Sequence, residues 1–430
     1  MSPDHPSSGL GARIQHAVAR HEKAIREFCA ALVAVPTENP PGRRYRECAR
    51  LIARQLQALR LPAQIVRVPS RRLAGADSAG RHRTEPRWCV LSSLGEGQRS
   101  LYFHGHYDVV PAAHPRQFHP VVKNGVLAGR GSADMKGGIA AMIYAMVVVR
   151  ELRLPLDGRI GLLLVPDEET GGAGGSRYLL ESGRLGTNGI GMLTPEPTSG
   201  VIWNACRGAI SMRVTVRGKP AHVGLHFRGV NAFEQAMQVA QAFATLKRRV
   251  ATRRTRYTIS PAAARQSVLL VGGRAAGGTN FNAVPAEFSF TVDRRINPEE
   301  SLAREKRALL AVIERFRRRG FRIDAEIFQE EHAAGFAPNE PVALAIAQSV
   351  REITGRAPAF EMCPGLLEIR FYAERGVPAF AFGPGQLEVA HGPSESVVLK
   401  KVYAFTAIYT LAAARILSPE SGGSTAQPYP

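Results

Sequence analysis

The sequence predicts an α/β protein, with a mostly parallel sheet covered by helices on both faces and a smaller α+β domain inserted into it. Two observations lead to this prediction. Through the first half of the chain, continuous aliphatic runs such as "GRIGLLLVP" alternate with helical stretches, as in parallel sheets that are buried on both faces. From about residue 208, apolar and polar residues alternate instead, as in "AISMRVTVRG", and this period is typical of half-exposed antiparallel strands.

The first expected elements are two amphipathic helices and three strands. Apolar residues recur at helical spacing over about 25–33 and stop at Pro36, and a second helix is expected at about 46–59. The runs "AQIVRV", "WCVLSSL" and "SLYFHGH" indicate strands, and the polar stretch 70–87 between the first two indicates a solvated loop. The apolar "GGIAAMIYAMVVVREL" then predicts a buried helix, and "GIGMLTPEP" a further central strand.

Two domains are the natural expectation for 430 residues. The inserted domain is expected at 208–320, because this stretch has the order strand, helix, strand, strand, helix. The larger domain would then comprise residues 12–207 and 321–418, since strand–helix alternation returns at "FRIDAEIF". Residues 1–11 and 419–430 are expected to be flexible tails.

Composition favours an ordinary globular protein, with 45% hydrophobic and 21% charged residues. No run of about 18 apolar residues predicts a membrane-spanning helix, and the N-terminal "MSPDHPSSGLG" lacks the layout of a secretory signal. The five cysteines are scattered, odd in number and never spaced as CxxC. This pattern predicts reduced thiols in a cytoplasm, without a disulfide framework or a cysteine zinc site.

The formal net charge of +20 raises nucleic-acid binding as an alternative that rests on charge alone. The excess is mostly arginine, dispersed through stretches such as "TRRTRY" and "RRRGFR", without an aromatic-interleaved basic motif or a recognition helix. We therefore interpret the positive charge as a general preference for arginine throughout the chain. We expect no nucleic-acid partner and no membrane partner. A positive potential would still steer an anionic substrate toward the protein.

Five polar clusters lie at the end of a predicted strand or at the start of a predicted helix of the larger domain. They are "HGHYD" (104–108), "GRGSADMKGG" (129–138), "PDEETGG" (166–172), "TPEP" (194–197) and "VAHGPSES" (389–396). In doubly wound sheets, ligands bind at the carboxyl ends of the strands. We therefore expect the clusters to converge on one rim of the sheet, an arrangement that core packing does not explain.

These clusters supply the residue types of a dinuclear hydrolytic metal site, which needs about two imidazoles and three carboxylates, one of them bridging the ions. Asp108 lies two residues after His106 and could hydrogen-bond the ring nitrogen of His106 that does not bind metal. Glu168 lies beside a candidate ligand and could act as a general base. Each residue alone has a plainer interpretation; Asp134, for example, precedes a helix and would serve as its cap. The candidate ligands are His106, Asp134, Glu169, Glu196 and His391.

The blocks "HGHYDVVP", "GRGSADMKGG", "DEETGG", "PEPT" and "AHGPSES" also resemble the signature blocks of one enzyme family, in the same order. It is the family of co-catalytic zinc amidohydrolases that includes acetylornithine deacetylase, succinyl-diaminopimelate desuccinylase and carboxypeptidase G. The resemblance extends over about residues 20–416. It implies that His106 binds one ion, Asp134 bridges both and Glu169 binds the second, with Glu196 and His391 completing one ion each.

The resemblance also implies the catalytic roles. Glu168 matches the general base of the family, and Asp108 matches the aspartate that orients the first histidine. A non-proline cis peptide is implied after the bridging aspartate, at Asp134–Met135. His104 is expected to support the site by packing or hydrogen bonding rather than to bind an ion.

The inserted domain would be the lid and dimerisation domain of this family. In "GKPAHVG", His222 matches a histidine that reaches across a homodimer and stabilises the developing oxyanion. In "TNFNAVP", Asn282 matches a substrate-contacting asparagine. In "DRRINPEE", Arg295, in preference to Arg294, matches an arginine that pairs with a substrate carboxylate.

One loop departs from the family pattern. Relatives commonly have a small polar residue and an aspartate in the segment that matches "PGLLEIRF", where this chain has Leu366, Leu367 and Glu368. Because this loop, from Gly365 to Leu367, is expected to border the substrate pocket, the leucines suggest a more apolar substrate tail. They also argue against an acetylornithine or diaminopimelate enzyme proper.

The function expected from the sequence is that of a cytoplasmic amidohydrolase with two divalent metal ions, zinc by family default and cobalt or manganese as alternatives. It would cleave an amide bond of an N-acyl amino acid, a small peptide or a related carboxylate-bearing small molecule, through a metal-activated water and the base Glu168. The alternative on the same scaffold is hydrolysis of a non-peptide C–N bond, as in a ureido, formamide or aromatic amine substrate. A non-enzymatic relative is a further alternative, against which the intact ligand set and Glu168 argue.

Overall fold

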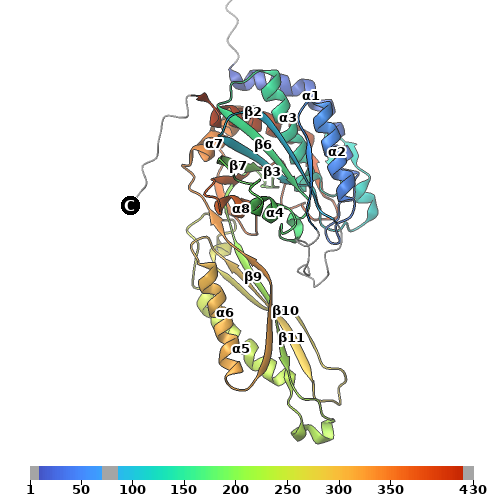
Figure 1. Cartoon of the computed structure of the whole chain (residues 1–430), viewed down its shortest axis with the longest axis vertical. Coiled ribbons are helices and arrows are strands. Elements are labelled where there is room, and N and C mark those ends of the chain that lie inside the picture. The colour runs from blue at the N-terminus through green and yellow to red at the C-terminus, as the bar shows by residue number, and fades with distance from the viewer. Residues whose placement is uncertain (1–8, 70–85, 420–430) are drawn as a thin grey trace, which may run out of the picture.

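The computed structural model describes residues 9–69 and 86–419. The loop expected at 70–87 and the tails expected at 1–11 and 419–430 lie mostly outside these ranges, and for the residues outside them these expectations stay predictions. The boundary of the N-terminal tail is wrong by two residues, because Leu10 and Gly11 already belong to the first helix, Leu10–Val33. Within the described ranges, the chain forms a larger domain around a nine-stranded sheet and a smaller domain around a four-stranded sheet. Figure 1 shows the smaller domain, with α5 (Ala232–Val250) and α6 (Leu302–Arg317), projecting from one end of the larger one.

The nine-stranded sheet is mixed. Its strands are β1 (Gln64–Arg67), β2 (Trp88–Glu96), β3 (Ser100–His106), β6 (Gly158–Val165), β7 (Gly189–Thr194), β8 (Ile202–Cys206), β13 (Ala334–Gly335), β14 (Phe360–Cys363) and β15 (Ala379–Ala381). They lie in the order β1-β2-β6-β3-β7-β15-β8-β13, with β14 paired to β8. The central pairings of β3 with β6 and β7, and of β7 with β15, are parallel, whereas β1, β2 and β13 pair antiparallel toward the edges. The α/β class is confirmed, and the parallel arrangement holds at the centre of the sheet.

Helices cover both faces of this sheet. One face carries α1 (Leu10–Val33), α2 (Tyr45–Ala58), α3 (Gly137–Glu151), α7 (Pro341–Thr354) and α9 (Leu399–Ile416), and the other carries α4 (Ser176–Glu181) and α8 (Ile369–Ala373). Successive residues of a strand point to opposite faces. Accordingly, Leu101 and Phe103 of β3 belong to the first core and Tyr102 to the second.

The helix α3 lies at the centre of the first core. The stretch Ser132–Glu151, which contains α3, is long and apolar enough to span a membrane by length and composition, but its apolar part, residues 132–149, is buried inside the protein. It packs against α1 and α9. Its apolar character is therefore explained by burial, as the sequence predicts for "GGIAAMIYAMVVVREL".

A small three-stranded sheet joins two distant segments near the rim of the large sheet. It consists of β4 (Val121–Lys123), β5 (Val126–Ala128) and β16 (Ser396–Val398), and β16 pairs with β5. Because β5 precedes the polar cluster 129–138 and β16 follows the cluster 389–396, this pairing brings the two clusters together.

The smaller domain is an antiparallel sheet with two helices. It contains β9 (Gly208–Arg217), α5 (Ala232–Val250), β10 (Val268–Gly277), β11 (Glu287–Ile296), α6 (Leu302–Arg317) and β12 (Arg322–Glu331), with the strand order β10-β11-β9-β12. The strand β12 pairs with β9 from Arg322 to Glu331. The smaller sheet therefore extends beyond the expected boundary at 320, because β12 completes it before the chain returns to the larger domain.

Candidate active site

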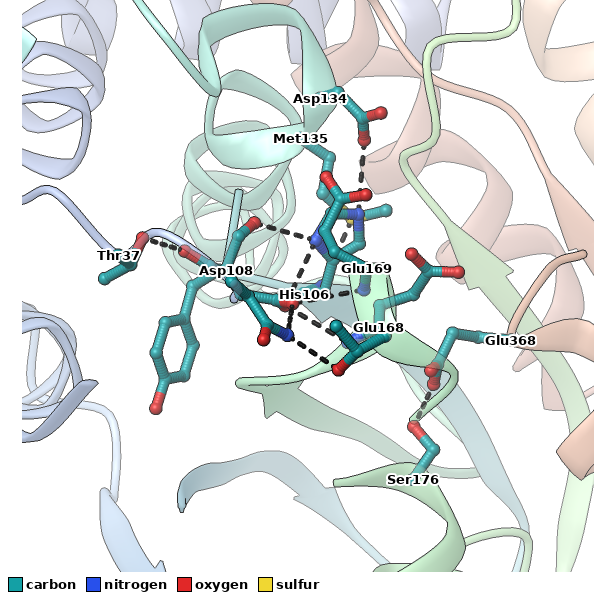
Figure 2. Close-up of polar contacts among 12 residues, drawn as sticks. Thr37, His106, Asp108, Asp134, Met135, Glu168, Glu169, Ser176 and Glu368 are labelled. Carbon is teal, nitrogen blue, oxygen red and sulfur yellow. Dashed lines mark hydrogen bonds and ion pairs between the residues drawn. The ribbon is translucent and has the colours of Figure 1, made fainter. Parts of the chain in front are cut away.

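The predicted ligands meet at one rim of the large sheet, as Figure 2 shows in part. His106 is the last residue of β3, and Glu169 and Glu196 follow β6 and β7 within a few residues. Asp134 lies in the turn Ser132–Lys136 that leads into α3. Ligand atoms of His106, Asp134 and Glu169 all lie within 4.8 Å of one another. The convergence expected from the ends of parallel strands is therefore present.

His106 is held so that one ring nitrogen points into the cluster. Its Nε2 lies 3.2 Å from Oδ1 of Asp134, and its Nδ1 lies 3.0 Å from the backbone oxygen of Asp108 and 3.4 Å from the Asp108 carboxylate. The imidazole is 1% exposed. Contacts at Nδ1 fix the ring orientation, and this leaves Nε2 for a ligand in the cluster.

Asp134 lies between two imidazoles. Its Oδ1 is 3.2 Å from Nε2 of His106, and its Oδ2 is 3.2 Å from Nε2 of His391. Burial alone would raise the pKa of Asp134, but the hydrogen bonds with His106 and His391 hold this pKa well below its usual range. The peptide bond Asp134–Met135 is cis, as the resemblance implies.

The backbone around Asp134 is fixed from the segment that carries His391. The amide groups of Ala133 and Asp134 both donate to Oε1 of Glu395, at 3.1 Å each. Oε2 of Glu395 in turn accepts from Arg130 at 2.5 Å. The buried Arg130–Glu395 pair thus connects the two clusters that the three-stranded sheet brings together.

Close approach of α3 to the end of β7 depends on a glycine. A Cβ atom at Gly138 would lie 2.3 Å from Cβ of Pro195, which is far too close for any side chain. Pro195 precedes Glu196 in the chain. The second glycine of "MKGG" therefore allows the turn that carries Asp134 to lie against the segment that carries Glu196.

Glu169 and His391 complete the accessible side of the cluster. Nε2 of His391 lies 3.2 Å from Oε1 of Glu169. The side chain of His391 is 50% exposed, and its backbone has φ 62°, a region that non-glycine residues seldom occupy. Hydrogen bonds with Asp134 and Glu169 raise the pKa of His391 to about 10. His391 thus covers the carboxylates from the solvent side.

Glu196 is the residue whose surroundings point most directly to a cation. It is 5% exposed, and its Oε1 has no hydrogen-bond partner within the described part of the chain. Burial raises the pKa of Glu196 well above its usual range. A buried carboxylate without partners is costly unless a cation compensates its charge. The mixed imidazole and carboxylate donors fit a divalent ion such as zinc, cobalt or manganese.

Glu168 faces a cavity beside the cluster. This cavity has a volume of about 800 Å³ and lies between the two domains, with Glu168, Leu366, Arg370 and His391 in its lining from the larger domain. Burial, together with the charges of Glu169 and Glu368, raises the pKa of Glu168 to about 8. A carboxylate with such a pKa is suited to accept and return a proton near neutral pH.

Asp108 positions the two consecutive glutamates as well as His106. Its Oδ1 accepts the backbone N–H of Glu168 at 3.2 Å, and its Oδ2 accepts that of Glu169 at 3.1 Å. Oδ2 also accepts from Nδ2 of Asn39 at 2.8 Å. Sequence reasoning assigned Asp108 to the histidine alone, because hydrogen bonds to a neighbouring strand end leave no signal in the sequence.

The expected substrate arginine lies in the lining of the cavity. Arg295, on β11, lines it and forms an ion pair with Asp293 through distances of 2.7 and 3.2 Å. Its neighbour Arg294 is fully buried and pairs with Glu300 and Glu305. Only Arg295 of the two is therefore open to a ligand.

The leucine loop is divided between the cavity and the core. Leu366 lines the cavity, whereas Leu367 is 3% exposed and packs in the second core with α8. Gly365 does not line the cavity, and its backbone oxygen accepts from the N–H of Arg207 at 3.0 Å. The expectation of a substrate contact is thus wrong for Leu367, because the chain turns into α8 at this point and directs Leu367 inward. The expected contacts of Gly365 and Leu366 stay predictions.

His222 and Asn282 are not part of the cluster within one chain. The exposed His222 accepts the N–H of Gly224 at its Nδ1, at 3.1 Å. The backbone oxygen of Asn282 accepts from Val223 at 2.9 Å. Both residues belong to the smaller domain, and neither lines the cavity that contains Glu168. Their expected catalytic and binding roles stay predictions.

Sequence reasoning missed one buried arginine in the cavity. Arg370 is 1% exposed and pairs with Glu331 at 3.0 Å, and it also donates to the backbone oxygen of Gly171 at 3.0 Å. It therefore ties α8 to the end of β12 and to the loop after Glu168 and Glu169. No signal in the sequence joins these segments, since they are distant along the chain.

A buried pair behind the site was expected only in part. Nε2 of His104 lies 2.6 Å from Oε2 of Glu368, and both side chains are fully buried. The hydroxyl of Ser176 donates to the same carboxylate, and Nδ1 of His104 is 3.0 Å from the hydroxyl of Tyr372. His104 therefore supports the site as predicted, while Glu368 points away from the cavity.

The fold and this cluster define a class, that of metal-dependent hydrolases with an inserted domain over the active site. Residues 102–415 match the profile of Peptidase family M20/M25/M40, and the chain belongs to this family. It is therefore a metallo-hydrolase that acts on amide bonds.

Among curated proteins, the chain is similar to a succinyl-diaminopimelate desuccinylase of Nitrosomonas europaea, with 29% identity over 80% of this chain and 92% of the relative. It is also similar to the N-formyl-4-amino-5-aminomethyl-2-methylpyrimidine deformylase of Bacillus subtilis, with 24% identity over 92% of this chain and 95% of the relative. Among solved structures, a family M20 metallo-carboxypeptidase of Sulfolobus solfataricus has a TM-score of 0.72 at 16% identity, covering 92% of this chain and 99% of that chain. The structural likeness supports the fold.

Proposed function

We propose that this hydrolase cleaves the amide bond of an N-acyl amino acid, a small peptide or a related carboxylate-bearing compound, with Glu168 as general base. The observation that carries the proposal is the buried cluster in which Asp134 contacts both His106 and His391, directly beside the cavity that Glu168 faces. A carboxylate between two imidazoles is suited to bridge two ions. The proposed ligands are His106, Asp134, Glu169, Glu196 and His391.

Two divalent ions, when bound, would polarise the amide carbonyl and lower the pKa of a water molecule. Glu168 would accept the proton of the attacking water and then deliver it to the leaving nitrogen. The raised pKa of Glu168, about 8, supports this exchange near neutral pH. Asp108 would hold both Glu168 and His106 in place through the hydrogen bonds described above. Zinc is the first candidate ion, and cobalt and manganese fit the same donors.

The cavity suits a substrate with one charged and one apolar part. Arg295 would pair with a substrate carboxylate, in exchange for part of its contact with Asp293. Leu366 and Leu270 add apolar surface to the same cavity. A desuccinylase and a deformylase among the relatives both release an acyl group from nitrogen, which fits this assignment.

Hydrolysis of a non-peptide C–N bond remains the second candidate. The presence of Leu366, where relatives commonly have a small polar residue, favours an apolar or aromatic substrate part. The deformylase relative aligns with 92% of this chain, and its substrate carries a formyl group on an aminomethylpyrimidine. A formamide substrate would use the same ligands and the same base.

We further propose that the chain acts in the cytoplasm as a homodimer in which His222 and Asn282 serve the active site of the partner subunit. Exposed apolar side chains surround His222: Val223 is 52% exposed, Phe227 70% and Phe281 97%. Clustered exposed apolar residues of this kind are typical of protein contacts. The five cysteines are all buried and unpaired, which fits a reducing compartment.

A hydrolysis screen tests the proposed function. The metal-reconstituted protein would be incubated with N-acyl amino acids, dipeptides and N-formyl aromatic amines, and release of free amine would be measured. We expect turnover of at least one compound class, with loss of turnover in the variant Glu168→Gln. Equal amine release by Glu168→Gln and by the unchanged protein would contradict the role of Glu168 and indicate a contaminating activity.

A further inference from the structure

A second hollow lies away from the catalytic cavity, between α2 and the edge strands β1 and β2. It has a volume of about 730 Å³, within the range of small-molecule sites. None of its lining residues also lines the cavity that contains Glu168. Its charged lining consists of Arg44, Arg46, Arg50, Arg54, Arg67 and Glu47.

The helix side of this hollow carries a row of like charges. Arg46, Arg50 and Arg54 follow one another at four-residue intervals on α2, and all three are exposed. Residues at this spacing lie on the same face of a helix, and like charges there destabilise it. The lone acidic residue of the lining, Glu47, pairs with Arg44 at 3.0 Å. The row therefore calls for an explanation other than helix stability.

The strand side adds a further cation and an aromatic ring. Arg67 of β1 lies directly opposite Trp88 of β2 in the antiparallel register. The guanidinium groups of Arg46 and Arg67 lie 5.5 and 5.6 Å from the centre of the Trp88 ring. Stacking on an indole orients a guanidinium while leaving its N–H groups free to donate. Arginines from both sides thus border one space next to an aromatic side chain.

The row differs from other surface arginines in its grouping around one hollow. Some arginines elsewhere on the described surface have acidic partners, such as Arg177 with Glu374 at 2.6 Å and Arg213 with Glu326 at 2.7 Å, and others, such as Arg304 and Arg307, are exposed and do not line this hollow. Within the described ranges, Arg46, Arg50, Arg54 and Arg67 form no ion pair. Guanidinium groups match phosphate oxygens through paired hydrogen bonds. Several unpaired guanidinium groups around one hollow therefore fit an anion with more than one phosphate group.

We propose that this hollow binds a small ligand with at least two linked phosphate groups, through Arg46, Arg50, Arg54 and Arg67. The ligand would be either an inorganic polyphosphate or a nucleoside polyphosphate, and in the second case Trp88 would contact the base. This proposal is independent of the hydrolytic reaction, since it uses none of the residues assigned to that reaction.

Binding would be measured on the full chain by calorimetry and by tryptophan fluorescence, with tripolyphosphate and ATP as probes. Trp88 and Trp203 are the two tryptophans of the chain, and Trp203 is buried at 5% exposure, so Trp88 is the expected reporter. The unchanged protein should bind one equivalent. In the double variant Arg50→Gln/Arg54→Gln, the Kd should rise at least about tenfold, because two charge-assisted contacts are lost.

The matched control is Arg304→Gln/Arg307→Gln on α6, which removes the same charge from exposed positions far from the hollow. This control should bind like the unchanged protein, and any chelation of metal by the probes affects both variants equally. Tighter binding of ATP than of tripolyphosphate, abolished by Trp88→Leu, would identify a nucleotide; equal binding would identify phosphate alone. Unsaturable binding, equal losses in both double variants, or affinity that appears only with long RNA would overturn the proposal.

Discussion

Glu168 and Glu169 are consecutive in the chain but have different environments. Both line the cavity, but only Glu169 contacts an imidazole of the cluster, that of His391 at 3.2 Å. The short helical turn Glu168–Thr170, held by hydrogen bonds to Asp108, directs the two carboxylates apart. In the proposed mechanism, Glu169 would bind metal and Glu168 would transfer the proton.

The variant Glu168→Gln tests this division of roles. The amide cannot accept a proton, so kcat should fall by about 10²–10⁴-fold. Bound metal, measured by elemental analysis, should stay unchanged because Glu168 is not a ligand. Glu374→Gln, which changes a carboxylate that pairs with Arg177 and does not line the cavity, is the control and should retain activity. Parallel loss of metal and activity in Glu168→Gln would mean that Glu168 binds an ion.

The raised pKa of Glu168 predicts the direction of the pH dependence. A general base works in its deprotonated form, and burial raises the pKa of Glu168 above its usual value. The activity should therefore be present at high pH and decline as the pH falls through this raised pKa. In a profile of kcat/KM against pH, with bound metal measured at each pH, the midpoint of the acid limb should lie above pH ~4.5, the ordinary pKa of a glutamate. A midpoint at or below the ordinary pKa of a glutamate would argue against Glu168 as the general base.

The candidate ligands could be proposed from the sequence because each lies in a short polar motif near the end of a strand or the start of the next element. The partners of these ligands could not. Arg370 and Glu331 meet only because β12 ends beside α8. Similarly, the sequence does not say which of two adjacent leucines faces the cavity, since this depends on the turn that begins α8.

At the scale of elements, the buried contact of His104 and Glu368 connects β3 to α8, and Ser176 adds α4. β3 ends two residues later at His106, and α8 continues to Arg370, which lines the cavity. The contact therefore fixes two elements that carry site residues relative to each other. Both ring nitrogens of His104 have partners, and Oε2 of Glu368 contacts His104 and Ser176, whereas Oε1 of Glu368 has no hydrogen-bond partner within the described part of the chain.

A double-mutant cycle tests this contact. His104→Ala and Glu368→Ala should each lower the free energy of unfolding by about 3 kcal/mol, because each leaves a buried partner unsatisfied. The double variant should cost about 1–3 kcal/mol less than the sum of the two. Denaturant unfolding would measure this coupling. The exposed pair Arg213–Glu326 is the control and should couple by less than about 1 kcal/mol; an equally small coupling for the buried pair would contradict its role.

The strand β12 shows what sequence reasoning could and could not establish about elements. The alternation in "RIDAEIF" marks a half-exposed strand. Its partner does not follow from the alternation, and the position after α6 is compatible with either domain. The strand β12 belongs to the smaller domain, because it pairs with β9 and buries Ile323 in the core of that domain.

At the scale of the whole molecule, the proposed dimer gives a specific prediction for mixed subunits. Glu168→Ala and His222→Ala should each be inactive or strongly impaired. In a mixed dimer, one active site would combine an intact Glu168 with an intact His222 from the other subunit. Mixing the two variants under conditions of subunit exchange should therefore restore activity. Without recovery in dimers shown by mass spectrometry to be mixed, His222 would not act across subunits.

Two domains, an inserted smaller sheet and a rim of polar clusters could be predicted because they follow from chain order and periodicity. The antiparallel edges of the large sheet could not, because their strands have no distinguishing period. The proposed role of His222 in the active site of a partner subunit does not follow from chain order or periodicity either.

Metal removal and return tests the central claim most directly. The protein would be dialysed against a chelator and then titrated with zinc, cobalt or manganese, while bound metal and amine release from an active substrate are measured together. We predict that activity disappears with the metal and returns as the bound metal approaches two ions per chain. Full activity in protein shown to contain no metal would contradict the account.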